Sequence, residues 1–520
     1  MNKSKFLKTV SAILLMVTFS TDAVADVQLP AIFSDNMVLQ RNQSIPIWGW
    51  AEPAEKITVS LGKQTKTVVT GGSGVWRLTL DALPAGGPWT MTVSGKNKLI
   101  VKNIFVGEVW ICSGQSNMAM QVSRCKDFPQ EQASAKYPKI RMFTVSRATS
   151  VAPAADCNGR WTICSPQTVG GFSATAYFFG RKLHRELGVP VGLINTSWGG
   201  TPVEAWTSLQ AQKANPAIAP VLMKWSKTIA TYNPETVSRT YLARLARWKK
   251  AAAKAKADGK RPPRRPRRPV NPKTSQHRPA NLFNGMINPL IPYGIRGAIW
   301  YQGEHNASRE FPHLYQTQLT TMITDWRRRW KQGDFPFLFV QLPNFRTPQK
   351  QPVEPSGWVT VREAMLKTLT VPNTGMAITV DIGEAGDIHP KNKQDVGKRL
   401  ALWALGTTYK KNIVYSGPIA KTHSVKNGRF TISFNHTGDG LKTRDGGEVK
   451  GFAIAGPDRK FVIAQAKIEN GTVVVWSDAI KKPQAVRYSW AANPNGNLIN
   501  SAGLPASPFR TDDWKPPRKP

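Results

Sequence analysis

Residues 107–121, GEVWICSGQSNMAMQ, mark the point where the chain changes from one kind of fold to another. They include the end of a near-continuous apolar run that begins at Ile104. A strand that is apolar at almost every position is typical of a parallel sheet buried on both faces. Ser116 follows this run directly, in a turn of small and polar residues. The stretch therefore predicts a buried parallel strand with a hydroxyl beyond its carboxyl end.

Ser116 has two interpretations when this stretch is taken alone. The G-x-S-x-G elbow of α/β-hydrolases requires a second glycine, and Met118 stands at that position. A serine directly before NMAMQV is also a typical helix N-cap. The residue is either a nucleophile or a cap, and the rest of the sequence has to decide between these roles.

Downstream of residue 106, apolar strand patterns alternate with amphipathic helix patterns. Strands are expected at residues 104–113, 191–198, 297–302, 335–342 and 375–382. Helices are expected at residues 173–187, 313–330, 361–369 and 393–405. This alternation predicts an α/β domain, residues 106–410, whose parallel sheet is covered by helices on both faces.

The two flanks have a different pattern of short strands separated by glycine and proline turns. Residues 26–105 and residues 411–520 both contain apolar residues at every second position, as in KITVSLG (56–62) and RFTISF (429–434). Such an alternating pattern is typical of small antiparallel β-sandwiches. We therefore expect an N-terminal and a C-terminal β-sandwich-like domain around the α/β domain.

Residues 1–25 have the pattern of a secretory signal peptide. Three lysines precede a short apolar run, and Ala23-Val24-Ala25 is typical of a cleavage site. The sequence contains no second apolar run of membrane-spanning length. We expect an exported protein, periplasmic or extracellular, without a membrane span. Its four cysteines lack the spacing of a zinc site, so no metal is expected.

The formal net charge is +39, and one insertion, residues 244–280, carries about a third of it. Between Arg244 and Arg278, 14 Lys or Arg residues face one Asp. Proline, alanine and like charges predict a disordered, solvated segment. The alternative is a tether for an acidic polysaccharide or another anionic surface. Nucleic acid is not expected as a partner, because no nucleic-acid motif is present and export argues against a genomic target.

The predicted strands end in turns that carry the groups of an acyl-transfer site. Ser116 follows the first strand, Gly199-Gly200 the second, QGEHN (302–306) the third, and GEAGDIHP (383–390) the last. Ligands of open α/β sheets bind beyond the carboxyl ends of the strands. A hydroxyl, an imidazole, a carboxylate and oxyanion donors are the groups that acyl transfer requires. Each residue alone has a structural alternative as a cap or turn residue, but their conjunction indicates a site.

Several stretches together resemble one known family. The stretches are GQSNM (114–118), SWGGTPVEAW (197–206), WYQGEHNA (300–307) and DIHPKNKQDVGKRLAL (387–402). They resemble the sialate O-acetylesterase family, within the larger group of SGNH hydrolases. Residues 29–41 and 486–511 resemble the same family. The resemblance thus covers nearly the whole mature chain outside the basic insertion, and it implies an SGNH-like sheet as the fold.

The resemblance implies a role for each residue of the SGNH set. Ser116 would be the nucleophile and His389 the general base. The backbone N–H groups of Ser116 and Gly200, with the side-chain amide of Asn306, would form the oxyanion hole. Gly199 is the alternative donor to Gly200.

The carboxylate behind the imidazole departs from the pattern of many SGNH enzymes. That pattern is D-x-x-H, and Gly386 stands at its first position, so Asp387, two residues before the histidine, is the expected third member. Glu384, a backbone carbonyl or a working Ser–His pair are the alternatives. The residues expected to bind substrate or to support the site are Gln115, Gly199, Gln302 and Glu304.

The function implied by the resemblance is removal of O-acetyl groups from carbohydrates through an acetyl-enzyme. This acyl-transfer chemistry requires no organic cofactor either. Sialic acid and acetylated plant or algal polysaccharide fragments are the candidate substrates. The aromatic residues that could stack on sugar rings are Trp198, Trp206, Trp300 and Tyr301. Two alternatives stay open: a carbohydrate- or polyanion-binding surface protein with a vestigial site, and a lipase or thioesterase on the same frame.

Overall fold

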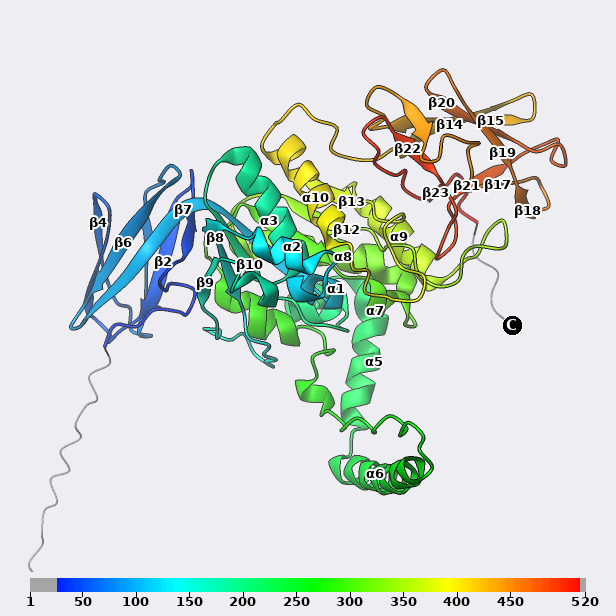
Figure 1. The fold of residues 1–520 in the computed structure, drawn as a ribbon. Helices are drawn as coiled ribbons and strands as arrows, with labels where there is room; N and C mark the ends of the chain where they lie inside the picture. Colours follow the sequence, from blue (N-terminus) through cyan, green and yellow to red (C-terminus); the bar gives the residue numbers. More distant parts are fainter. Residues whose placement is uncertain (1–25, 515–520) are drawn as a thin grey trace, which may run out of the picture.

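The computed structural model describes residues 26–514, which form three regions along the chain (Figure 1). A small β region from the start of the chain lies at one end. A layered α/β region occupies the middle, and a second β region lies at the other end. The α/β class, with its central sheet and its further C-terminal sheets, is as the sequence predicts.

Strand β7 (Lys98–Gly114) joins the first two regions. Its first half pairs antiparallel with β6 (Gly86–Ser94). Its second half lies parallel between β11 (Gly297–Tyr301) and β10 (Val191–Asn195). The predicted boundary between residues 105 and 106 therefore falls inside one continuous strand.

The central sheet has the strand order β13-β12-β11-β7-β10-β8-β9. Every neighbouring pair is parallel except β8 with β9. The bounds of the outer strands are β13 (Thr374–Ala377), β12 (Phe337–Val340), β8 (Tyr137–Thr144) and β9 (Trp161–Cys164). The carboxyl ends of the parallel strands consequently lie along one edge of the sheet.

Helices cover both faces of this sheet, as the alternation of strands and helices predicts. The four main ones are α3 (Ala174–Leu187), α8 (Tyr315–Trp330), α9 (Gly357–Thr368) and α10 (Lys393–Trp403). Along β7, Trp110 and Cys112 belong to the core that includes α3 and α10. Val109 and Ile111 belong to the opposite core, with α8 and α9. Successive residues of a strand point to opposite faces, so burial on both sides explains the continuous apolar run.

The N-terminal region consists of short antiparallel strands that share a core with the central sheet. The strands are β1 (Val38–Gln40), β2 (Ile45–Trp50), β3 (Lys56–Leu61), β4 (Gln64–Val69) and β5 (Val75–Leu80). Strands β2 and β5 pair with each other, while β3 pairs with β4 and β6. Only β1 pairs parallel, alongside β7.

The C-terminal region contains two four-stranded antiparallel sheets with one shared core. The first sheet consists of β14 (Ile419–Lys426), β15 (Arg429–Asn435), β20 (Thr472–Trp476) and β19 (Gln465–Glu469). The second consists of β18 (Phe461–Ile463), β17 (Phe452–Ala455), β21 (Ala485–Tyr488) and β23 (Phe509–Arg510). A small pair, β16 (Leu441–Thr443) with β22 (Leu498–Asn500), completes the region. This arrangement is a sandwich.

The basic insertion differs from its prediction, because its first part is helical. Helix α5 (Ala219–Ala230) leads away from the sheet, and α6 (Pro234–Ala257) lies at its far end (Figure 1). Asn233 caps α6 by accepting the N–H of Thr236, and the helix is rich in Ala, Lys and Arg, which favour helices. The expectation of disorder is therefore wrong for residues 244–257. None of the residues of α6 is buried, so the expected lack of packing is present.

The predicted signal peptide, residues 1–25, lies outside the described residues. Between residues 26 and 514, no helix combines the length and the apolar character that crossing a bilayer requires. All four cysteines, Cys112, Cys125, Cys157 and Cys164, are free thiols.

Candidate active site

Ser116 is placed by the end of β7 and is not a helix cap. It is the first residue of the short helix α1 (Ser116–Ala119), whose N-cap is Gln115, with no side-chain capping bond. Its Oγ lies 2.8 Å from Nε2 of His389. Gly114 allows the end of β7 to lie close to β11, because its φ is +137° and a Cβ there would lie 2.2 Å from the carbonyl oxygen of Tyr301. The structure thus brings the predicted nucleophile and the predicted base into contact.

His389 is half-buried, and its environment keeps the imidazole neutral. Burial lowers the pKa of His389 below its usual value, because desolvation disfavours the charged ring. The carboxylate of Asp387 acts in the opposite direction, while the charges of Lys393 and Arg124 lower the pKa further. A neutral imidazole near pH 7 is the form that accepts a proton from a serine hydroxyl.

Asp387 is the carboxylate nearest to the imidazole, but it holds the ring loosely. Its Oδ1 lies 3.6 Å from Nδ1 of His389, which is longer than a hydrogen bond. The same oxygen accepts the backbone N–H of His389 at 2.9 Å. Glu384, the sequence alternative, instead accepts the backbone N–H of Lys391 at 2.7 Å. The pair is therefore Ser–His, with Asp387 beside it as a half-exposed charge.

The turn after β10 lies directly against the nucleophile. A Cβ placed on Gly199 would lie 3.3 Å from Cβ of Ser116, whereas Gly200 has a φ of +73° and open space on that side. Among residues 26–514, no group accepts the backbone N–H of Ser116, Gly199 or Gly200. Unpaired backbone N–H groups beside a nucleophile are the donors that stabilise an oxyanion.

Asn306 is placed differently from its prediction as an oxyanion donor. It lies in the short helix α7 (Glu304–Ala307), and its Nδ2 donates to Oε2 of Glu204 at 3.1 Å and to Oε1 of Gln318 at 3.3 Å. Its Oδ1 accepts the backbone N–H of Val203 at 3.2 Å. Both amide N–H groups are thus already donated, because the side chain is buried among acceptors. In this structure Asn306 ties the turns after β10 and β11 together.

Gln115 and Gln302 form a buried framework behind the turns. Oε1 of Gln115 accepts Nε2 of Gln302 and the backbone N–H of His305, both at 3.2 Å. Nε2 of Gln302 also donates to Oδ1 of Asn306 at 2.7 Å. These bonds link the ends of β7 and β11, so the two glutamines support the site from behind.

A buried polar network that the sequence did not reveal lies under the loop of His389. Nδ2 of Asn117 donates to Oε1 of Glu304 at 2.5 Å and to the carbonyl of the residue before His389 at 3.0 Å. Nζ of Lys393 donates to Oδ1 of Asn117 and to the carbonyl of the residue after His389, both at 2.7 Å. The network therefore holds the backbone on both sides of the imidazole.

Burial perturbs both ionisable groups of this network. It lowers the pKa of Lys393 to about 7 and raises the pKa of Glu304 above its usual range. Perturbed groups of this kind are typical of functional sites. Glu304, one of the predicted residues, thus lies in this network, together with Asn117 and Lys393, which were not predicted. The only sequence signal for Asn117 is its position next to the serine.

Three of the four aromatic residues proposed as sugar platforms are core residues. Trp206, Trp300 and Tyr301 are fully buried. Trp198 is partly exposed, and the guanidinium of Arg147 lies 5.9 Å from its ring centroid. Trp198 is therefore the one candidate of the four with an accessible ring.

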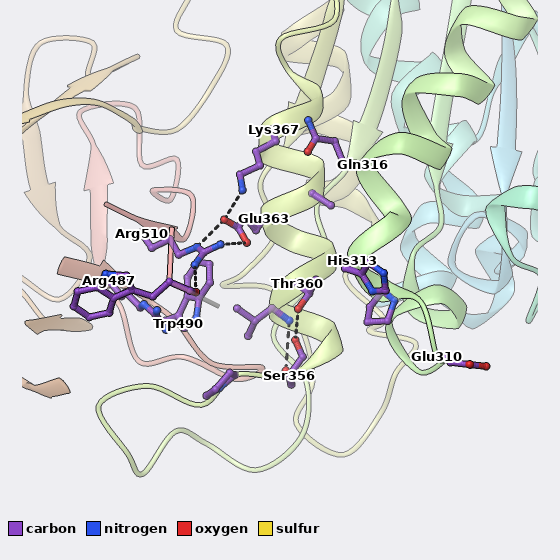
Figure 2. A pocket seen from close by; sticks show the side chains of 15 residues that line it. Glu310, His313, Gln316, Ser356, Thr360, Glu363, Lys367, Arg487, Trp490 and Arg510 are labelled. Atoms are coloured by element: carbon purple, nitrogen blue, oxygen red, sulfur yellow. Dashed lines mark hydrogen bonds and ion pairs between the residues drawn. The ribbon is translucent and has the colours of Figure 1, made fainter. Parts of the chain in front are cut away.

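A cavity of about 410 Å³ lies between α9 and the C-terminal region (Figure 2). Its charged groups are already paired, Arg510 with Glu363 at 2.8 Å and Arg487 with Asp512 at 2.7 Å. Both guanidiniums lie against the ring of Trp490, at 5.4 and 5.5 Å from its centroid. The cavity is thus a junction between two regions, and the ring of Trp490 is covered there by two guanidiniums.

The geometry defines a class of protein. A serine hydroxyl paired with a neutral imidazole, with unpaired N–H groups beside it at the carboxyl edge of a parallel sheet, is the arrangement of an acyl-transfer hydrolase.

Comparison with known proteins gives the family. The family model described as carbohydrate esterase, sialic acid-specific acetylesterase, matches residues 106–257 and 277–405. Sialate O-acetylesterase of Rattus norvegicus is 31% identical over 432 residues, which cover 75% of this chain and 76% of that protein. The Homo sapiens protein of the same name is 28% identical over 425 residues, covering 74% and 72%.

A solved structure agrees with these matches. The crystal structure of a carbohydrate acetylesterase from Xanthomonas citri has a TM-score of 0.79 and 37% identity, covering 94% of this chain and 100% of that one. The chain belongs to the sialic acid-specific acetylesterase family of carbohydrate esterases, as its motifs predicted. It is a carbohydrate O-acetylesterase.

The lowered pKa of His389 predicts the acid limb of the pH profile. A base role for His389, which the resemblance implies, requires an unprotonated imidazole, so activity should be present above its pKa and be lost as the pH falls through it. We expect kcat/KM for p-nitrophenyl acetate to be constant near pH 7 and to fall with a midpoint below 6.5. A midpoint above 6.5 would contradict the environment described for His389.

The loose contact of Asp387 predicts a small effect for its removal. Asp387→Asn should lower kcat/KM less than about tenfold, because exposed pairs contribute about 0–1 kcal/mol. Glu384→Gln, which changes the neighbouring carboxylate of the same loop, is the matched control. A loss of about 10³-fold or more in Asp387→Asn alone would show that this carboxylate orients the imidazole during the reaction.

The network under His389 predicts a positioning role for Lys393. Lys393→Met should lower kcat/KM about 10- to 100-fold, because small displacements of a catalytic group have effects of this size. The charge of Lys393 lowers the pKa of His389, so the acid limb should also move to higher pH. Lys391→Met, an exposed lysine of the same loop, should change neither quantity. If Lys393→Met leaves the acid limb unchanged and only lowers the melting temperature, Lys393 contributes to stability alone.

Proposed function

We propose that this esterase acts through Ser116 and a covalent acetyl-enzyme. The observation that carries the proposal is the 2.8 Å contact between Ser116 Oγ and His389 Nε2 at the rim of the sheet. In the first step, Oγ attacks the acetyl carbonyl carbon while Nε2 takes its proton. The tetrahedral species then expels the sugar oxygen, which receives that proton, and acetyl-serine remains.

The second step repeats this chemistry with water. His389 takes a proton from water as the water oxygen attacks the acetyl carbon of the intermediate. Collapse breaks the bond to Oγ, the proton returns to Ser116, and acetate leaves. The two products are the free sugar hydroxyl and acetate, and no redox step occurs.

The proposed oxyanion hole uses backbone donors. The unpaired N–H groups of Ser116, Gly199 and Gly200 support this assignment, and loss of one such donor typically costs about 2.7–4 kcal/mol. Asn306 would join only if its bonds to Glu204 and Gln318 were exchanged for the substrate. With these roles the site is of the SGNH type, which the placement of its serine, glycines, asparagine and histidine around one framework supports.

We further propose that the acetylated sugar carries a carboxylate. Three arginines belong to the surroundings of the site: Arg124 acts electrostatically on His389, Arg147 lies 5.9 Å from the ring centroid of Trp198, and Arg309 donates to His305 at 3.2 Å. Among residues 26–514, none of the three forms an ion pair with a carboxylate. Unpaired guanidiniums bind carboxylates well, so sialic acids and uronic-acid polymers are favoured over neutral acetylated xylan.

Two other functions are tested against this proposal. A lipase or thioesterase would hydrolyse octanoyl esters at least as well as acetyl esters, whereas we propose a preference for acetyl. A binding protein with a vestigial site would not react with serine-directed inhibitors.

The pattern of residues 1–25 supports the additional proposal that the protein acts after export.

Ser116→Ala is the decisive variant for the serine mechanism. It should lower acetate release from O-acetylated sialosides and from acetylated polygalacturonate about 10⁴-fold or more, with unchanged thermal unfolding. Ser123→Ala, an exposed serine a few residues further along, is the matched control and should retain full activity. Wild-type turnover in Ser116→Ala would refute the serine mechanism.

A further inference from the structure

A protruding arm, which we define as residues 234–271, contains most of the basic insertion. It consists of α6 and a return segment, residues 258–271, without regular secondary structure. Helix α5 carries the arm away from the sheet, and α6 lies at the far end (Figure 1). Every residue of α6 is at least partly accessible, so the shape of the arm is not required to fill any core.

The arm is strongly positive and its charges are not neutralised. It contains 13 Lys or Arg residues and two acidic ones, Glu235 and Asp258. None of these residues appears in an ion pair with any residue between 26 and 514. Like charges on a helix face repel one another by a few tenths of a kcal/mol per pair. A surface of this kind attracts polyanions over roughly 10 Å at moderate salt.

The return segment lies folded against the helix. Nε1 of Trp248 donates to the carbonyl oxygen of Pro263 at 2.8 Å, and the guanidinium of Arg265 lies 5.7 Å from the same ring. Basic side chains of the helix and of the return segment are therefore held close together. This gives a polymer two rows of cationic groups along one arm.

The segments on either side of the arm contact residues that follow β11. On α5, Nζ of Lys224 pairs with Glu310 at 2.7 Å. On the return side, His277 stacks on His305 with ring centroids 5.1 Å apart. The backbone N–H of His305 donates to Gln115, the residue before Ser116. The segments that carry the arm are thus connected, through His277 and His305, to the turn that holds Ser116, although α6 itself lies at the far end of α5.

We propose that the arm binds an acidic polysaccharide and holds it near Ser116. The inference rests on the proposed function, because the bound polymer is taken to be the acetylated substrate. A carbohydrate is favoured over a bilayer, since an interfacial helix needs a face of large apolar residues. On α6 only Leu242 is a strongly exposed large apolar residue, and Trp248 is folded against the return segment.

The test removes charge from the return segment without touching the active site. Arg261, Arg264, Arg267 and Arg268 are changed to Gln together, leaving Arg265 on Trp248. The control changes the same four residues to Lys, which preserves the charge. The substrates are O-acetylated polygalacturonate, neutral acetylated xylan and p-nitrophenyl acetate.

The Gln variant should raise KM for acetylated polygalacturonate about tenfold at about 0.05 M NaCl, with kcat unchanged. The effect should disappear at about 0.5 M NaCl, because salt screens exposed charges. The Lys control should behave as wild type, and neither variant should change KM for acetylated xylan or p-nitrophenyl acetate.

Three outcomes separate this proposal from the others. An unchanged KM on the acidic polymer overturns it. If the Gln variant loses binding to phosphatidylglycerol vesicles or to DNA but still binds polygalacturonate, the proposal is also overturned, and the arm is assigned to another polyanion. Ser116→Ala should still sediment with polygalacturonate; if it does so while the wild type releases no acetate from it, the arm proposal stands and the proposed function fails.

Discussion

Burial of β7 on both faces is the constraint on which the rest of the site depends. From Phe105 to Gly114 every residue is buried, with one core above the sheet and another below it. The strand is therefore fixed between β10 and β11, and its end cannot shift without opening a core. Gly114 completes this constraint, because a side chain there would collide with the carbonyl of Tyr301. The position of Ser116 follows from the packing of the sheet.

The groups around Ser116 are held by polar bonds rather than by apolar packing. Gln115 and Gln302 connect the turns, while Asn117 and Lys393 hold the loop of His389. Burying a lysine and a glutamate costs free energy, and a well-packed apolar core would be more stable. The network directs its bonds to the backbone on both sides of His389, where a defined position matters for proton transfer. Stability is exchanged there for geometry, as is common in active sites.

The strands and helices of the α/β region were predictable because their cause is local in the sequence. A continuous apolar run indicates a strand that is buried on two faces, and an amphipathic period indicates a helix that is buried on one face. The sites that were not predictable depend on contacts between distant residues. Asn117 and Lys393 meet across 276 positions, and neither carries a periodic signal. The orientation of Asn306 depends on Glu204 and Gln318, which no motif joins to it.

Helix α6 was missed for a different physical reason. The segment has too few apolar residues to pack against the rest of the protein, and for that reason it was expected to be disordered. Its helix instead rests on local terms, a cap at Asn233 and residues of high helix propensity. The boundary at residue 105 was drawn where the pattern changes from alternating to continuous burial. That change is real, but it occurs within β7, because one strand serves two regions.

The charge of the protein has its origin in its composition. The sequence has 32 acidic residues against 71 basic ones, and several of the acids are consumed inside the fold. Glu108, Asp325 and Asp512 have almost fully buried side chains that pair with arginines. Each such pair neutralises one arginine as well, so the excess of basic groups at the surface comes from the composition and not from the pairing.

The positive electrostatic potential of these basic groups would affect the reaction in two ways. The charges of Arg124 and Lys393 disfavour a proton on His389, which keeps the proposed base ready at neutral pH. The same field favours the approach of a sugar that carries a carboxylate, and it does nothing for a neutral ester. A substrate carboxylate near His389 would in turn raise the pKa of the imidazole and help it to hold the proton that it delivers to the leaving sugar oxygen. The proposed preference for an acidic sugar and the lowered pKa of His389 would therefore both follow from the same basic side chains.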